Sequence, residues 1–181
     1  MSISHSDPTT KLTYDDYVLF PNDGKRHEII NGRHYMNAAP SPRHQSVSRH
    51  IHFQLYQQIE LNGLGEVICA PIDVQLSETD VVQPDLVVVL KENRIITTTK
   101  IKGVPELVVE ILSNSTLDYD RQLKKQLYEQ AGIPEYWIVD PDNQIVDQYK
   151  LGENSKYESE TASDTIVFGP TGATVDLRKV W

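Results

Sequence analysis

Two short apolar runs, Leu86–Leu90 and Leu107–Val109, constrain the fold of this chain more than any other feature. Runs of this length match buried β-strands and are far too short to span a membrane as helices. The second run belongs to a predicted strand over Glu106–Leu112, which is apolar enough to lie in the middle of a sheet. The chain is therefore expected to build its core around a sheet.

Turn chemistry and hydrophobic periodicity predict the other elements. Asn31-Gly32 suits a two-residue turn, so Arg26–Ile30 and Arg33–Met36 are expected to form a hairpin. An apolar residue at every fourth position predicts a helix from Pro42 to Leu61, with Ser41 as its cap. A second helix is expected over Asp118–Ala131, and further strands over Glu66–Ala70, Asp73–Leu76, Asp85–Leu90, Glu135–Val139 and Ile145–Tyr149. This order predicts an α/β fold with a mixed sheet flanked by helices.

Composition places the chain among ordinary globular proteins. Hydrophobic residues make up 39% and charged residues 24% of 181 residues. We expect residues 1–10 to form a flexible leader and residues 11–181 a single domain, with a β-rich C-terminal edge over Tyr157–Trp181. No secretory signal is recognisable, so the cytoplasm is the default compartment. The lone Cys69 is interpreted as a small buried hydrophobe.

The net charge of −9, from 17 basic and 26 acidic residues, bears on possible partners. Tight nonspecific binding of nucleic acid depends on Lys and Arg neutralising phosphates, so this balance counts against it. Carboxylates clustered at a metal site would raise the negative count, and a bound cation would offset them locally. An acidic chain is therefore compatible with a metal-dependent enzyme that acts on phosphodiesters.

Two carboxylates stand at the ends of predicted strands. Asp85 opens one strand after Pro84, and Glu110 lies near the end of another, 25 positions later. If the strands are neighbours, the two acids meet and favour a cation between them. Hard oxygen ligands suit Mg²⁺ or Mn²⁺, which would activate a water and stabilise charge on a scissile phosphate. The simpler alternatives are a turn cap at Asp85 and an edge ion pair at Glu110.

Three further residues extend this candidate site. Lys124 follows a polar loop and shares a helix face with Asp120 and Tyr128, so it can orient a nucleophile or stabilise phosphorane charge. Its alternative is a solvated lysine paired with Asp120, and Lys125 is expected at the surface.

Glu28 lies within an apolar strand and is a candidate further metal ligand. His44, in the first turn of a helix, is a candidate phosphate contact or proton carrier, or a polar residue near the cap.

Several stretches together resemble the Uma-type endonuclease family of the PD-(D/E)XK restriction-endonuclease-like superfamily. The resemblance spans roughly residues 12 to 150. Its matching segments are 26–32, 39–44, 82–85, 108–113, 120–124 and 132–140. It implies a restriction-endonuclease-like core and metal-dependent DNA hydrolysis, with Asp85 and Glu110 as metal ligands and Lys124 as the catalytic lysine. Leu112 stands where the superfamily signature usually has lysine, so the resemblance suggests that Lys124 has taken over that role.

The leading hypothesis from the sequence is a Mg²⁺- or Mn²⁺-dependent endonuclease with DNA as its substrate. A non-catalytic binding or interaction module on the same fold is the alternative, and the acidic balance favours it. Cleavage of RNA at the same site is a third possibility. Superfamily nucleases often act as pairs, which leaves a homodimer open. No membrane partner is expected.

Overall fold

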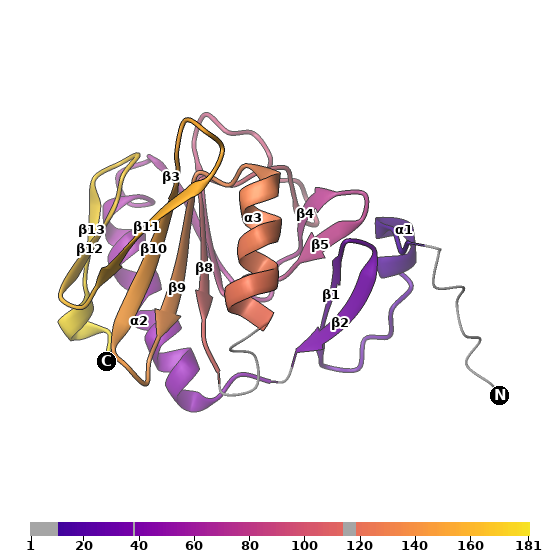
Figure 1. The fold of residues 1–181 in the computed structure, drawn as a ribbon, viewed down its shortest axis with the longest axis horizontal. Helices are drawn as coiled ribbons and strands as arrows, with labels where there is room; N and C mark the ends of the chain where they lie inside the picture. Colours follow the sequence, from indigo (N-terminus) through magenta and orange to yellow (C-terminus); the bar gives the residue numbers. More distant parts are fainter. Residues whose placement is uncertain (1–10, 38, 114–118) are drawn as a thin grey trace.

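The computed structural model describes residues 11–37, 39–113 and 119–181 (Figure 1). The helical elements of these ranges are α1 (Tyr14–Tyr17), α2 (Pro42–Gln58), a π-helical segment (Tyr119–Lys124), α3 (Lys125–Ala131) and a 3₁₀ turn (Leu177–Lys179). The strands are β1 (Arg26–Ile30), β2 (Arg33–Asn37), β3 (Gly65–Cys69), β4 (Val74–Ser77), β5 (Asp80–Val82), β6 (Leu86–Leu90), β7 (Ile101–Lys102), β8 (Leu107–Ile111), β9 (Glu135–Asp140), β10 (Ile145–Leu151), β11 (Tyr157–Ala162), β12 (Thr165–Phe168) and β13 (Ala173–Asp176).

A six-stranded sheet in the order β11-β10-β9-β8-β6-β3 forms the centre of the molecule. Its β8 and β9 run parallel, whereas its other neighbouring pairs are antiparallel. All five residues of β8 are buried, as predicted for a strand in the middle of a sheet. Leu86 of β6 lies opposite Val109 of β8, so the start of β6 meets the end of β8. The mixed α/β fold expected from the sequence is confirmed.

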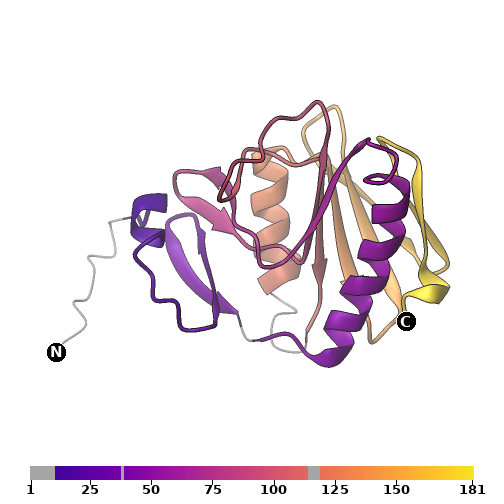
Figure 2. The same ribbon diagram turned by 180° about the vertical axis from the view of Figure 1, so that it is seen from behind.

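Helices α2 and α3 cover opposite faces of this sheet (Figures 1 and 2). The four-residue repeat of α2 supplies Val47, Ile51 and Leu55 to one hydrophobic cluster, which also contains Trp137. Leu127 of α3 belongs to a second cluster. Each sheet face thus has its own apolar cover, because both faces of the central strands are hydrophobic.

A smaller sheet, in the order β2-β1-β5-β4-β7, lies beside the central one. The predicted hairpin of β1 and β2 turns at Asn31 and Gly32, whose φ angles of 52° and 74° fit the left-handed conformation that Asn-Gly tolerates. Strands β5 and β7 were not expected from the sequence. With three and two residues they are too short to show an alternating pattern, and their pairing with β4 is what makes them strands.

The C-terminal tail differs in part from the expected sheet edge. Strand β11 does extend the central sheet, pairing with β10. Strands β12 and β13 instead form a separate hairpin that packs against α2. Gln54 and Gln58 of α2 each exchange two hydrogen bonds with the backbone of β13, at Asp176 and Thr174 respectively. Two half-buried side-chain amides of α2 therefore hold the tail in place.

The expectation of a buried Cys69 was wrong, because its side chain is exposed. The residue ends the edge strand β3, on the same side as the buried Val67. It lies opposite the N-terminal half of α2, which presents polar Ser48, Arg49 and His52 there instead of apolar groups. Apolar packing therefore stops short of Cys69.

The predictions for helix α2, the N-terminal leader and membrane-spanning segments can also be compared with the structure. The first predicted helix ends at Gln58 rather than Leu61, and the predicted leader, residues 1–10, lies outside the described residues. Within the described part of the chain, no helix is long and apolar enough to cross a membrane.

The packing of α2 on the central sheet predicts a large difference between two leucines. Leu55 is fully buried, whereas Leu61 just after the helix is 65% exposed. We expect Leu55→Ala to lower the free energy of unfolding by about 3 kcal/mol, because it leaves a cavity in the core. Leu61→Ala should change it by less than about 0.5 kcal/mol. Urea unfolding of both variants measures this, and similar losses would contradict the described packing.

Candidate active site

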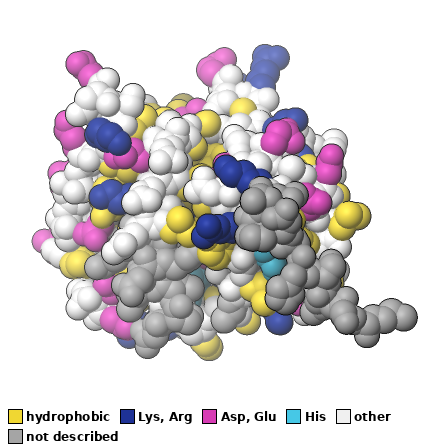
Figure 3. Space-filling model, turned by 45° about the vertical axis from the view of Figure 1, so that its right-hand side comes forward, with side chains coloured by type: hydrophobic (Ala, Val, Ile, Leu, Met, Phe, Trp, Pro, Cys, Tyr) yellow, Lys and Arg dark blue, Asp and Glu magenta, His cyan; other side chains and the backbone are white. Residues whose placement is uncertain are grey.

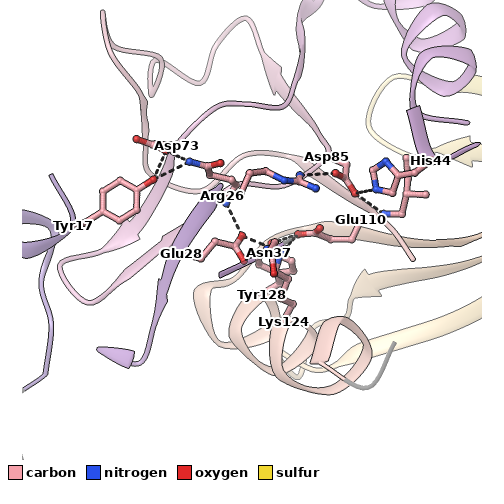
Figure 4. A network of polar contacts seen from close by, with 12 residues as sticks. Tyr17, Arg26, Glu28, Asn37, His44, Asp73, Asp85, Glu110, Lys124 and Tyr128 are labelled. Atoms are coloured by element: carbon pink, nitrogen blue, oxygen red, sulfur yellow. Dashed lines mark hydrogen bonds and ion pairs between the residues drawn. The ribbon is translucent and has the colours of Figure 1, made fainter. Parts of the chain in front are cut away.

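Three buried carboxylates meet where the two larger sheets adjoin (Figure 4). Asp85 directly precedes β6, Glu110 lies in β8, and Glu28 lies in β1 of the smaller sheet. Their exposed fractions are 4%, 3% and 0%. Because a buried carboxylate is costly without partners, the groups around each one determine whether this arrangement is stable.

Asp85 is held by two side chains and one backbone group. Its Oδ1 accepts from Arg26 Nη1 at 2.8 Å, and its Oδ2 lies 2.9 Å from both His44 Nε2 and the Ile111 backbone nitrogen. Burial would raise the pKa of this carboxyl, but the hydrogen bond and charge of His44, followed by those of Arg26, outweigh it. The pKa of Asp85 therefore lies below its ordinary value, and the group is ionised at neutral pH.

Lys124 joins the other two carboxylates. Its Nζ lies 2.8 Å from Glu110 Oε1 and 3.0 Å from Glu28 Oε1, and the lysine is only 1% exposed. Tyr128 donates its hydroxyl hydrogen to the same Glu110 oxygen at 2.7 Å. Burial first and the charge of Glu110 second raise the pKa of Tyr128 well above its ordinary value, so the phenol stays a donor.

Glu28 accepts two further hydrogen bonds. The Gln83 backbone nitrogen donates to its Oε1 and Asn37 Nδ2 donates to its Oε2, both at 2.7 Å. With Lys124 these contacts place three donors around a fully buried carboxylate. Glu28 therefore holds the lysine from the side opposite Glu110 rather than extending toward solvent.

The local helix geometry brings Lys124 into this position. The segment from Tyr119 to Lys124 is π-helical, and the α-helix continues from Lys125 with Tyr128 one turn beyond Lys124. Such π turns redirect side chains and are frequent at functional sites. The predicted shared face of Lys124 and Tyr128 is confirmed by their common partner Glu110. The side chain of Asp120 lies outside the described residues.

Two features expected under the simpler alternatives, a solvated Lys124 and a Glu110 at a sheet edge, are not observed. Lys124 is buried and not solvated, and Glu110 lies on a central strand rather than at an edge. Leu112, which occupies the usual lysine position, is buried in the hydrophobic cluster on the α3 side. Lys125 lies outside the site, 4.5 Å from the Tyr149 ring centroid. The predicted catalytic lysine, Lys124, is thus a buried side chain paired with Glu110 and Glu28.

Reasoning from the sequence missed two partners of the site. Arg26 contacts Asp85, and Asn37 contacts Glu28, yet neither was a candidate. Strand alternation offered a signal for the first, because Arg26 and Glu28 are two residues apart and face the same side of β1. Nothing in the sequence indicated Asn37, which reaches the site only through the pairing of β1 with β2.

One small cavity adjoins the two carboxylates that the sequence predicts as ligands of Mg²⁺ or Mn²⁺. Asp85, Glu110 and His44 all line one small cavity of about 30 Å³, which is enough for a water-sized group. Among the described residues, no three or more His, Cys, Asp or Glu side chains are grouped to enclose an ion. Mg²⁺ is usually held by one or two carboxylates, with waters and substrate phosphate completing its shell. Asp85 and Glu110 offer that kind of donor set.

A comparison with protein families assigns the chain. A family described as "Uma2: Putative restriction endonuclease" matches residues 14–173, which contain every site residue described above. The chain belongs to the Uma2 family. The resemblance expected from its motifs is confirmed, and membership of this family supports a nuclease activity.

A solved structure shares the fold of this Uma2 family member. It is described as a "putative nuclease belonging to DUF820 from Anabaena variabilis ATCC 29413", with a TM-score of 0.78 over 93% of this chain and 97% of that one. The two sequences are 16% identical, so the likeness concerns the fold. No match was found among curated proteins.

The contacts of Asp85 predict a pH-dependent contribution to stability. Because its folded pKa lies below the ordinary 3.8, the ionised group stabilises the fold above that value and loses its effect as pH falls through the folded pKa. We expect Asp85→Asn to cost about 3 kcal/mol at neutral pH in metal-free buffer, since it leaves Arg26 without its anion. The deficit should shrink under strongly acidic conditions.

Urea midpoints of the wild type and Asp85→Asn between pH 2 and 7 measure this prediction. Asp142→Asn is the matched control, because Asp142 forms a largely exposed pair with Arg43, and its effect should stay below about 0.5 kcal/mol. A deficit at Asp85 that is constant or grows toward low pH would contradict the prediction.

Proposed function

We propose that this chain is a divalent-metal-dependent endonuclease that hydrolyses DNA. The observation that carries the proposal is the buried Lys124, held between Glu110 and Glu28 beside a cavity that Asp85 also lines. A charged lysine that is 1% exposed costs folding energy, and a fold without a chemical use for it could place an apolar side chain there instead.

Asp85 and Glu110 would hold the cation from neighbouring strands. When bound, Mg²⁺ or Mn²⁺ would lower the pKa of a coordinated water and offset negative charge on the scissile phosphate. The pKa of Asp85 is depressed, so that carboxylate is ionised and available as a ligand at neutral pH. Its present partners, Arg26 and His44, are donors that a phosphate oxygen can equally accept from.

Lys124 supplies a positive charge that the protein holds in place before substrate arrives. Glu28 and Glu110 fix its ammonium group, and Tyr128 fixes Glu110 in turn. A preorganised cation beside the reacting phosphate stabilises the charge that develops in the transition state, without having to reorganise. The same ammonium can orient the attacking water through a hydrogen bond.

His44 and Arg26 act at the other carboxylate. The His44 Nε2 lies 2.9 Å from Asp85, so the ring is oriented toward the cavity and can carry a proton or contact a phosphate oxygen. The Arg26 guanidinium combines a fixed charge with several donors, which suits two oxygens of one phosphate. Both residues are thus placed to orient the substrate.

A binding module without catalysis is the second candidate, and the net charge of −9 favours it. In that case the buried charges would serve the fold, and the chain would bind a metal or a strand but cut neither DNA nor RNA. Cleavage of RNA at the same residues differs from the proposal only in substrate, and a requirement for the 2′-hydroxyl would reveal it.

Cleavage assays with matched lysine variants test the proposed activity. Plasmid, single-stranded DNA and RNA are incubated with Mg²⁺ or Mn²⁺ and with each protein. We expect cleavage of DNA by the wild type, and a loss of roughly 10²–10³-fold in Lys124→Met, because one preorganised charge has been removed. Lys125→Met, one residue away and outside the site, should retain the wild-type rate.

The pattern over these variants distinguishes the candidates. Equal cutting by Lys124→Met and the wild type would place the activity elsewhere or in a contaminant. No cutting by any protein, with circular dichroism showing all of them folded, would favour the binding module. Cleavage of RNA but not of DNA would identify RNA as the substrate.

Metal binding is predicted separately from cleavage. A ligand that binds only the folded state stabilises it, so Mn²⁺ should raise the unfolding temperature of the wild type. Asp85→Ala should lose this increase because one ligand is gone, whereas Asp142→Ala at the exposed pair should keep it. Differential scanning fluorimetry over a Mn²⁺ series measures the shift in unfolding temperature. If Asp85→Ala shows the same shift as the wild type, Asp85 is not a metal ligand.

A further inference from the structure

A second, larger cavity opens directly beside the candidate active site. It has a volume of about 530 Å³, and Arg26, His44 and Asp85 line both cavities. Its walls come from the segment before β1 (residues 22–26), the N-terminal half of α2 and the end of β3 with its following loop (residues 69–71). We call this cavity the α2 groove. Whatever occupies it also reaches the carboxylate of Asp85.

The α2 groove is locally basic in an acidic protein. Lys25, Arg26 and Arg49 line it, and His44 and His52 add two imidazole rings. Arg26 is paired with Asp85 and Lys25 with Asp23, so Arg49 adds a positive charge beyond these pairs. The chain as a whole carries −9. On the described part of the face in Figure 3, Asp and Glu side chains are scattered among a few Lys and Arg groups. The positive charge of the groove is thus a local feature that suits an anionic ligand.

Several buried polar atoms without partners belong to residues around the α2 groove. In the described residues, four such side-chain atoms lack a hydrogen-bond partner, and three of them belong to residues that line the α2 groove: Arg26 Nε, His44 Nδ1 and Gln83 Oε1. His44 is 94% buried, since its exposed fraction is 6%. Native proteins rarely leave such groups unsatisfied, and three of the four belong to residues around one cavity.

The size of the α2 groove limits what that ligand can be. Its 530 Å³ falls within the roughly 300–1,000 Å³ of pockets that enclose a small molecule. That volume holds a short stretch of one nucleic-acid strand and not a double helix. Gln45 and Arg49, which are exposed and one turn apart on α2, and the half-buried Ser48 supply polar groups along its length.

From these observations we propose that the α2 groove binds a single phosphodiester strand and leads it to Asp85. The proposal rests on the proposed nuclease function and adds the form of its substrate: an unpaired strand or a strand end, with its phosphates on Arg49 and Arg26. The alignment of a phosphate with the small cavity then follows from the continuity of the two cavities at Arg26, His44 and Asp85.

Cys69 provides a reporter for this groove that does not depend on cleavage. It is the only cysteine of the chain, its side chain is exposed, and it lines the α2 groove. A strand lying there would shield its thiol. The experiment measures the rate at which a neutral maleimide modifies Cys69 in EDTA, with increasing amounts of a single-stranded DNA oligonucleotide or a blunt duplex of the same sequence. Fluorescence anisotropy reports oligonucleotide binding in parallel.

We expect the single strand to slow modification at least fivefold and the duplex to have little effect. Arg49→Ala should need about tenfold more oligonucleotide for the same protection, because it loses one charged phosphate contact. Arg94→Ala is the matched control, since Arg94 is also exposed but does not line the groove. It should behave as the wild type.

The proposal would be overturned by unchanged modification of Cys69 while anisotropy shows bound oligonucleotide, or by equal protection from the duplex. The outcome is distinguishable from failure of the proposed function. Protection of Cys69 without cleavage under any metal condition would support strand binding in the α2 groove and contradict the nuclease activity. Metal-dependent cleavage without protection would support the nuclease activity and contradict strand binding in the α2 groove.

Discussion

The ammonium group of Lys124, buried between Glu110 and Glu28, ties together the parts of the molecule that make the site. The lysine comes from the end of the π-helical segment before α3, one glutamate from the central sheet and the other from the smaller sheet. Removing the lysine would leave two buried carboxylates without their common cation, at a cost of roughly 3–5 kcal/mol. The relative position of the two sheets is therefore linked to the pairing of these charges. This coupling explains why polar residues occupy otherwise apolar elements.

A second cluster of charged residues surrounds Asp85, and it differs from the Lys124 cluster in the cavities that it borders. Lys124 and Glu110 line the small cavity but not the α2 groove, whereas Arg26 and His44 lie at the wall that the two cavities share. The first group is suited to hold a preorganised charge, and the second is suited to meet an incoming anion. An overall charge of −9 is no obstacle to such a site, because phosphate recognition depends on the potential of the groove and less on that of the whole surface.

Much of this site was predictable because its members stand at recognisable places in secondary structure. Asp85 and Glu110 flank or lie within apolar strands, and neighbouring strands bring them together. Lys124 follows from helix periodicity, with Tyr128 one turn later. Arg26 and Asn37 were missed, since their roles arise from contacts between separate sheets and across a hairpin. Cys69 was placed wrongly because local hydrophobicity does not reveal where a covering helix turns polar.

By itself, the sequence determined the strand and helix types of the long elements, the hairpin turn at Asn31-Gly32 and the family to which the chain belongs. It did so because apolar periodicity, turn chemistry and short motifs are local properties. Only the tertiary structure decided that Glu28 holds Lys124, that the β12–β13 hairpin covers α2, and that a basic groove adjoins Asp85. These features depend on which distant segments pack together, and burial, charge pairing and cavity shape are properties of that packing.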